Sequence, residues 1–163
     1  MNCQLPFEMQ EQQQGNWCWA AVAASVTTYW PTPRQWSQCD VVNAELTQTK
    51  CCAEGNCASC DVQHSLQSVL TRVQHLCYTV TNAISYDDVC AELDAQRPLC
   101  ARIVTSNLGH FVAITGYVIG DLEQRLLVDD PGLGRGRREV PYDTLCKDYS
   151  GGGVWTHTYY LEA

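Results

Sequence analysis

Cys18 is the residue whose setting most clearly suggests covalent chemistry. It follows Gly15-Asn16-Trp17 and opens a run rich in alanine and valine that extends to Trp30. Asn16 is a good N-cap, so the pattern predicts a helix with Cys18 in its first turn, where the helix dipole stabilises a thiolate. A buried free cysteine is otherwise commonly a small apolar filler. Cys18 is therefore a candidate nucleophile if a base lies near it.

The base must be one of four histidines, and their settings differ. His64 lies in a predicted amphipathic helix, His75 in a connection, and His157 in an aromatic-rich strand near the C-terminus. Ordinary packing or exposure explains each of these three. His110 instead begins an apolar strand directly after Gly109, whose small size lets a partner approach the imidazole closely. We therefore expect His110 to be the general base.

A third group should orient the imidazole, and the next strand offers two carboxylates. That strand ends in Asp129-Asp130-Pro131. A strand followed by an ordinary Asp-Pro turn explains the same residues equally well. Because adjacent strand side chains point to opposite faces, only one of the two acids can face His110. These residues alone leave the choice open.

Three motifs together resemble those of the papain-like cysteine peptidases. They are Q-x5-C-W ahead of an alanine-rich helix, then G-H-F-V-A-I-T-G-Y, then V-D-D-P-G. The chain is similar to compact bacterial members, namely type III effector proteases of plant pathogens, peptidase domains that trim bacteriocin leaders, and related toxin domains. The resemblance extends over most of the chain. It implies hydrolysis of peptide bonds in a protein substrate by a secreted effector or an antibacterial toxin.

The resemblance also implies a role for each site residue. Cys18 would be the nucleophile, His110 the base and then the acid, Asp130 the orienting residue, and Gln12, six positions before Cys18, the oxyanion-hole donor. Asp130 is favoured over Asp129 because a proline follows it, although papain has Asn at this position. The same residues would also serve transglutamination or deamidation, which share the acyl-thioester. A non-catalytic binding module stapled by disulfides or zinc is a further alternative.

Eleven cysteines in 163 residues are many, and the number is odd. Ten could pair and leave one reactive thiol, and such a density is typical of an oxidising compartment, which favours secretion. The loop with Cys51, Cys52, Cys57 and Cys60 contains one Cys-x2-Cys spacing, which zinc sites use. No second well-spaced pair accompanies it, so we expect disulfides, with a pairing that the sequence does not determine and without a bond between the vicinal Cys51 and Cys52. We expect neither a cofactor nor a bound metal.

The order of the predicted elements indicates an α+β fold. A single papain-like domain over residues 1–163 would have a helical lobe over about 1–97 and an antiparallel sheet lobe over about 98–163. Expected helices extend from Asn16 to Trp30, from Thr32-Pro33 to Leu46, from Asp61 to Val73 and from Ser85 to Gln96. Expected strands are Leu99–Thr105, His110–Val118, Arg125–Val128 and Val154–Leu161.

The charge balance limits the partners. A net charge of -8 argues against nucleic acid and anionic membranes and mildly favours a basic substrate or partner. The resemblance to effector and toxin domains separately allows an inhibitor or immunity protein as a partner. No apolar run reaches the 18 to 20 residues or so of a membrane-spanning helix. Arg135, Arg137 and Arg138 form a short basic cluster, which we interpret as a solvated loop rather than a phosphate site.

Overall fold

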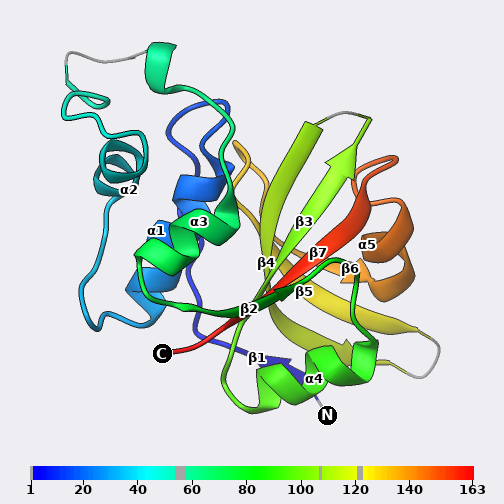
Figure 1. Ribbon diagram of the computed structural model, residues 1–163. Helices are drawn as coiled ribbons and strands as arrows, with labels where there is room; N and C mark the ends of the chain where they lie inside the picture. The colour runs from blue at the N-terminus through cyan, green and yellow to red at the C-terminus, as the bar shows by residue number, and fades with distance from the viewer. Residues whose placement is uncertain (1, 54–57, 107, 121–122) are drawn as a thin grey trace.

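The computed structural model describes residues 2–53, 58–106, 108–120 and 123–163, which form an α+β fold (Figure 1). The helices are α1 (Cys18–Tyr29), α2 (Gln38–Glu45), the 3-10 helix η1 (Ala58–Cys60), α3 (Leu66–Arg72), α4 (Tyr86–Asp94) and α5 (Tyr142–Lys147). The strands are β1 (Asn2–Gln4), β2 (Leu76–Val80), β3 (Leu99–Thr105), β4 (Leu108–Ile119), β5 (Gln124–Asp130), β6 (Gly136–Pro141) and β7 (Val154–Leu161). The predicted fold class is confirmed.

All strands join one antiparallel sheet of seven strands, in the order β2-β7-β3-β4-β5-β6 with β1 paired to β4. In the β3–β4 pair, Ile103 lies opposite His110, and in the β4–β5 pair Ala113 lies opposite Asp129. Main-chain hydrogen bonds fix these registers. The sheet thereby determines where the ends of β4 and β5 lie relative to each other.

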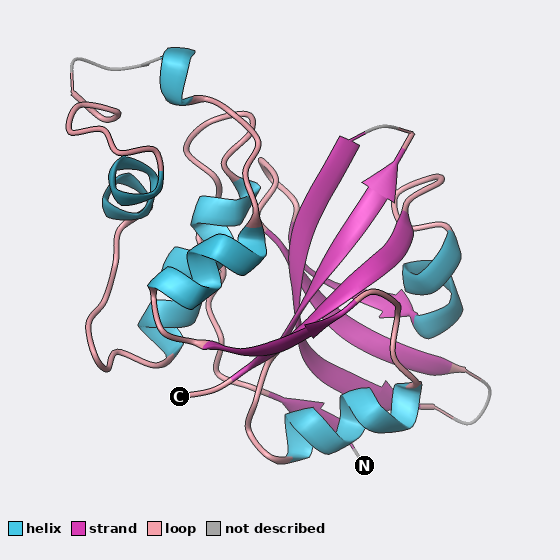
Figure 2. Cartoon of the chain, viewed as in Figure 1, coloured by secondary structure: helices cyan, strands magenta, loops and turns pink. Residues whose placement is uncertain are grey.

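Helices α1, α2 and α3 gather beside one side of the sheet, as Figure 2 shows. The side chains from Cys18 to Thr27 are all buried, so α1 is apolar all round and forms the centre of the core between α2, α3 and β4. Helix α4 contacts β1, β3 and β4, whereas α5 contacts β5, β6 and β7. The start of α1 is therefore held against the sheet by packing on every side.

Two helices begin later than the sequence suggests. Helix α2 begins at Gln38 rather than at Thr32-Pro33, because Ser37 and Asp40 form a reciprocal capping box at its start. Helix α3 begins at Leu66 rather than at Asp61, because Ser65 caps it. In both places a serine that satisfies free main-chain N–H groups determines where the helix starts.

Strands β1, β2 and β6 and helix α5 were not predicted. Strand β6 lies at one edge of the sheet and carries the sequence Gly-Arg-Arg-Glu-Val-Pro, in which charges obscure the strand pattern. Charged side chains are common on edge strands because they discourage pairing with other chains. The interpretation of Arg135, Arg137 and Arg138 as a solvated loop is therefore wrong for the last two, which lie in β6.

Candidate active site

Cys18 is the first residue of α1, and 6% of its surface is exposed. The N-cap is Trp17, which makes no side-chain hydrogen bond at the helix start, so the prediction of Asn16 as N-cap is wrong. Asn16 instead donates from its main-chain N to Asp61 Oδ1 (2.8 Å) and from Nδ2 to the Asp61 carbonyl (3.1 Å). The N–H groups of the first turn are thereby left without a side-chain cap, as a helix start that stabilises negative charge requires.

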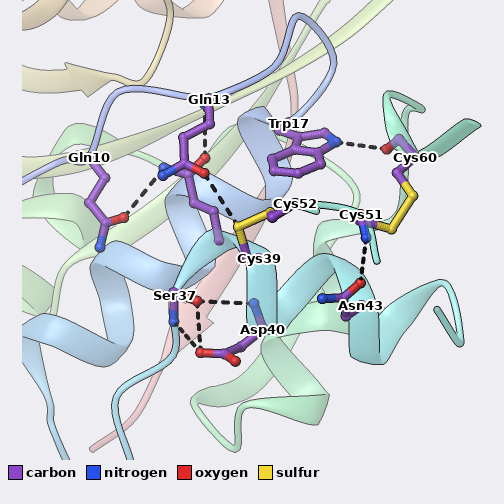
Figure 3. The surroundings of a disulfide bond; sticks show 11 residues. Gln10, Gln13, Trp17, Ser37, Cys39, Asp40, Asn43, Cys51, Cys52 and Cys60 are labelled. Atoms are coloured by element: carbon purple, nitrogen blue, oxygen red, sulfur yellow. Dashed lines mark hydrogen bonds between the residues drawn. A yellow bond between two sulfur atoms is a disulfide. The ribbon is translucent and has the colours of Figure 1, made fainter. Parts of the chain in front are cut away.

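The chain around residues 60–62 holds the segment around Cys18 in place. Trp17 Nε1 donates to the Cys60 carbonyl (2.7 Å), and Trp19 Nε1 donates to the Val62 carbonyl (2.9 Å). A disulfide links Cys60 to Cys51, as Figure 3 shows together with the Trp17 contact. Both indoles are fully buried, so each needs such an acceptor. The disulfide-bonded loop therefore fixes the residues on both sides of Cys18.

His110 and Asp130 contact each other between β4 and β5. His110 Nε2 lies 2.7 Å from Asp130 Oδ1, and the Asp130 side chain is 1% exposed. The Cys18 side chain lies close enough to His110 to affect its pKa, and both residues line the same cleft. Because Nε2 faces the carboxylate, Nδ1 is the ring nitrogen left for the sulfur. The three side chains therefore form a chain from the helix through the imidazole to the acid.

Three further donors surround the Asp130 carboxylate. Gly132 N donates to Oδ1 (2.8 Å), Tyr149 Oη donates to Oδ2 (2.8 Å), and Arg135 Nη1 lies 3.2 Å from Oδ2. Burial raises the pKa of Asp130, but the bonds from His110, Gly132 and Tyr149 outweigh it and hold the pKa well below its ordinary value. No pattern in the sequence marked Tyr149, which follows α5 and contacts the Asp130 carboxylate.

The pKa of His110 moves in the opposite direction. Burial alone would lower it, but the hydrogen bonds and charges of Asp130 and Cys18 raise the pKa of His110 to about 9. The imidazole is therefore held as an imidazolium at neutral pH. An imidazolium beside a thiol is the setting that favours a thiolate.

Asp129 faces away from His110, as the alternation along β5 requires. Its carboxylate accepts from Thr115 Oγ1 (2.5 Å) and pairs with Arg137, whose Nη2 is 2.9 Å from Oδ2. Arg137 Nη2 also donates to the Phe7 carbonyl (2.6 Å). Asp129 and Arg137 therefore attach the N-terminal segment to the sheet, which is a second reason why the solvated-loop interpretation fails.

Gln12 lies at the same cleft, on the segment that precedes α1. Its main-chain N donates to the Pro131 carbonyl (2.8 Å), and its side-chain Nε2 donates to the carbonyls of Gln14 (2.9 Å) and Gly15 (2.6 Å). Its Oε1 is buried and has no hydrogen-bond partner among the described residues. The amide nitrogen therefore lies between two carbonyl oxygens. If the side-chain amide were flipped, its oxygen would face these two carbonyl oxygens and repel them.

Gln12, Cys18 and His110 all line one cleft of about 630 Å³, together with Ile103 and Tyr149. Its volume is in the range of sites that enclose a substrate segment. The remaining histidines have other partners: His64 pairs with Glu45 (2.8 Å), His75 bonds the Glu162 carbonyl (2.9 Å), and His157 bonds Thr156 Oγ1 (3.0 Å). The cleft therefore brings together three of the four residues proposed from sequence, and the fourth, Asp130, contacts His110 from behind it.

The cysteines differ partly from expectation. Disulfides join Cys39 to Cys52 and Cys51 to Cys60, so the preference for disulfides over zinc is confirmed for these residues, while Cys57 lies outside the described residues. Ten cysteines could have paired, but only four of the described cysteines do so, and six are free: Cys3, Cys18, Cys77, Cys90, Cys100 and Cys146. Cys77 is exposed, so Cys18 is not distinguished by being the odd thiol.

A protein-family model described as "Papain-like cysteine protease AvrRpt2" matches residues 1–145 of the chain. A search of curated proteins found no match. Among solved structures, the peptidase domain of Streptococcus ComA, a bi-functional ABC transporter of a quorum-sensing pathway, is similar with a TM-score of 0.61 at 13% identity, over 96% of this chain and 99% of that chain. Digestive procathepsin L 3 of Tenebrio molitor is similar with a TM-score of 0.62 at 12% identity, over 99% of this chain and 69% of that chain. At these identities the similarity shows the fold.

Within the described residues, no helix is long and apolar enough to cross a membrane.

Proposed function

The chain belongs to the AvrRpt2 family of papain-like cysteine proteases, and from this premise we propose that it hydrolyses peptide bonds of a protein substrate through Cys18, His110 and Asp130. The observation that carries the proposal is the 2.7 Å contact between His110 Nε2 and Asp130 Oδ1, with Cys18 on the other side of the imidazole in the same cleft. A nucleophile, a base and an orienting acid in this order are the parts that thiol acyl transfer needs.

In the first half of the reaction, the Cys18 thiolate attacks the scissile carbonyl carbon and forms a tetrahedral oxyanion. The His110 imidazolium then gives its Nδ1 proton to the leaving amine, the C–N bond breaks, and an acyl-thioester remains on Cys18. In the second half, neutral His110 takes a proton from water, the hydroxide attacks the thioester, and the thiolate leaves. The substrate is cleaved by one water, and the enzyme returns to its starting state.

Asp130 keeps His110 in the form that this cycle needs. Its pKa lies well below the ordinary range, so the acid is ionised throughout the working pH range and its charge stabilises the imidazolium. Its bond to Nε2 also fixes the ring so that Nδ1 points to the sulfur. An Asp with four donors around it supplies both orientation and charge, whereas the Asn of papain supplies orientation without charge.

Gln12 is proposed to donate to the oxyanion. In the free enzyme both of its amide hydrogens are directed at carbonyl oxygens, those of Gln14 and Gly15. A charged oxyanion is a stronger acceptor than a neutral carbonyl, so one N–H would turn to it when it forms. Such a donor acts mainly in the transition state. The uncapped N–H groups at the start of α1 would supply the second donor.

The two disulfides support a place of action outside the reducing cytosol, as a secreted effector or toxin delivered to a target cell. The family match to AvrRpt2 is consistent with this proposal. Because the chain has a net charge of -8, an inhibitor or immunity protein with a basic binding face would be attracted to it.

The test is N-terminal proteomics of a target-cell extract treated with the active protein and, in parallel, with Cys18→Ala. The proposal predicts new protein N-termini that depend on Cys18. Conversion of Gln to Glu without cleavage would replace peptidase action with deamidation. Absence of both changes would favour a non-catalytic binding module.

A further inference from the structure

Gln38, the first residue of α2, is a buried polar side chain that lies against the segment carrying Gln12. It is 1% exposed. Its Oε1 accepts from Gln13 N (3.0 Å), and its Nε2 donates to the Glu11 carbonyl (2.9 Å) and to Gln10 Oε1 (3.3 Å). Burying a carboxamide costs free energy unless its hydrogen bonds are made, and here this segment makes them.

The main-chain groups that Gln38 contacts belong to the two peptide units on either side of Gln12. The Glu11 carbonyl is part of the unit before Gln12, and the Gln13 N–H is part of the unit after it. The N–H of Gln12 itself is bound to the Pro131 carbonyl (2.8 Å). Three main-chain groups next to Gln12 are thus tied down, so the direction in which its side chain leaves the backbone is fixed.

Gln38 is itself held firmly at the start of α2. Ser37 and Asp40 close the capping box around it: Ser37 N donates to Asp40 Oδ2 (3.0 Å), and Asp40 N donates to Ser37 Oγ (3.1 Å). The next residue, Cys39, forms the disulfide with Cys52. Figure 3 shows Gln10 and Gln13 beside this capped and cross-linked helix start. The helix start is therefore a rigid platform for the segment.

We propose that Gln38 is a positioning residue that fixes Gln12 at the cleft and thereby sets the geometry of the oxyanion donor. This inference rests on the proposed peptidase function. The position requires a group with one acceptor and one donor spaced to match a carbonyl and an N–H two residues apart. Only a carboxamide of this length provides both. Glutamate would keep the bond to Gln13 but set a negative oxygen against the Glu11 carbonyl, and methionine would keep the volume and lose both bonds.

The test is a double-mutant cycle of Gln38→Met with Gln12→Ala, measured on a cleaved peptide. In the wild-type background, Gln38→Met should lower kcat about tenfold with little change in KM, a fraction of the roughly 100- to 1000-fold that a lost oxyanion donor costs. In the Gln12→Ala background the same substitution should change kcat less than about twofold. Equal losses in both backgrounds would overturn the proposal.

Ser25→Ala provides the matched control. Ser25 Oγ accepts from Gln10 N (2.8 Å), so this variant removes a buried bond to the same segment but leaves the peptide units beside Gln12 untouched. It should lower the melting temperature as Gln38→Met does, while kcat changes less than about threefold. A kcat loss in Ser25→Ala as large as in Gln38→Met would show that general loosening of the segment explains the effect.

Two readouts keep this test separate from the proposed function. Hydrogen exchange at the Gln13 amide should be faster in Gln38→Met than in wild type, whether or not the protein cleaves a substrate. An unchanged exchange rate would show that the hydrogen bond from Gln13 N to Gln38 does not hold this segment. Alkylation of Cys18 should proceed at the wild-type rate in Gln38→Met, because the thiol does not depend on Gln12. If the wild-type protein cleaves no peptide, the proposed function is refuted. If the wild-type protein is active but the effects of Gln38→Met and Gln12→Ala on kcat are additive, only the positioning role of Gln38 is refuted.

Discussion

The two sides of the cleft hold their site residues by different means. On the sheet side, His110 and Asp130 lie on neighbouring strands whose register is fixed by main-chain hydrogen bonds. On the helical side, Cys18 and Gln12 depend on side-chain hydrogen bonds, a capping box and disulfides from α2 and residues 51–62. The sheet supplies a precise frame for the proposed base and its acid, whereas the side that carries the proposed nucleophile depends on many separate contacts. Damage to one contact should therefore matter more on the helical side.

The largest effect should come from the imidazole that joins the two sides. His110→Ala should lower kcat/KM by about 100- to 10,000-fold, because it removes both the base and the acid of the cycle. Its melting temperature should also fall, because the variant loses the ion pair with the buried Asp130, although Gly132, Tyr149 and Arg135 still contact that carboxylate. Steady-state kinetics and thermal unfolding measure the two quantities. His157→Ala, on β7, is the control, and a comparable loss there would refute the assignment.

On the helical side, Gln12→Ala should lower kcat by about 100- to 1000-fold with a much smaller effect on KM, as for other oxyanion donors. Gln13→Ala and Gln14→Ala should each cost far less, because the structure uses their main-chain groups. Kinetics of the three variants decide the matter. Equal small losses would leave the hole to main-chain groups, and a large loss at Gln14 alone would identify a different donor.

The sheet side makes a prediction about pH. The pKa of His110 is raised to about 9, so kcat/KM should fall above about pH 9 as the imidazolium loses its proton. Asp130→Asn keeps a hydrogen-bonding group but removes the charge, and the alkaline limb should move to about pH 8 or lower. A pH–rate profile of both proteins measures the shift. An unchanged limb would mean that Asp130 does not set the charge of His110.

The raised pKa of His110 also predicts how the free energy of unfolding changes with pH. Because the folded-state pKa of His110 lies above its ordinary value of 6.5, its stabilising contribution is complete below about pH 6.5 and is lost as the pH rises through about 9. Asp130→Asn should therefore lose stability relative to wild type mainly between about pH 4 and pH 9, and the difference between the two proteins should shrink above pH 9 and again below the ordinary aspartate pKa of 3.8. Urea unfolding across this range measures it, and a difference that grows at high pH would reverse the sign.

Removing a disulfide from the helical side should have the smallest effect on turnover among these variants. Replacing Cys51 and Cys60 by Ser should lower the free energy of unfolding by about 2–4 kcal/mol, chiefly by freeing the unfolded chain. Turnover per folded molecule should fall less than about tenfold, because Trp17 and Trp19 keep their carbonyl acceptors. Denaturant unfolding of the variant beside wild type measures the loss. Identical midpoints would show that this cross-link does not stabilise the nucleophile side.

The sequence predicted the sheet side better than the helical side, for a physical reason. Strands β3 and β7 have the predicted bounds, and the acids at the end of β5 are where the alternating pattern puts them. Strand patterns and the Asp-Pro turn are local signals, so a short stretch of residues contains them. That local information placed His110 at the start of one strand and the Asp129-Asp130 pair at the end of the next, whereas the choice of Asp130 depended on the resemblance to papain-like peptidases.

The helical side could not be predicted in the same way because its contacts join distant residues. Asn16 was expected to cap α1, but Asp61, 45 residues away, takes its hydrogen bonds. The disulfide pairing and the contact of Gln38 with residues 10–13 depend likewise on how separate segments meet. No pattern along the chain marks a buried glutamine as different from an exposed one. Only the packed fold reveals these contacts.

Alkylation of Cys18 tests the central claim most directly, namely that the imidazole on the sheet activates the thiol on the helix. Desolvation and the negative charge of Glu162 raise the pKa of Cys77, the exposed free cysteine among the described residues, which makes it a slow internal reference. With limiting iodoacetamide at pH 7 and peptide mapping, Cys18 should be modified first in wild type, and His110→Ala should slow it to the rate of Cys77 or below. Modification of Cys77 while Cys18 stays unmodified, or a Cys18 rate that His110→Ala leaves unchanged, would contradict the account.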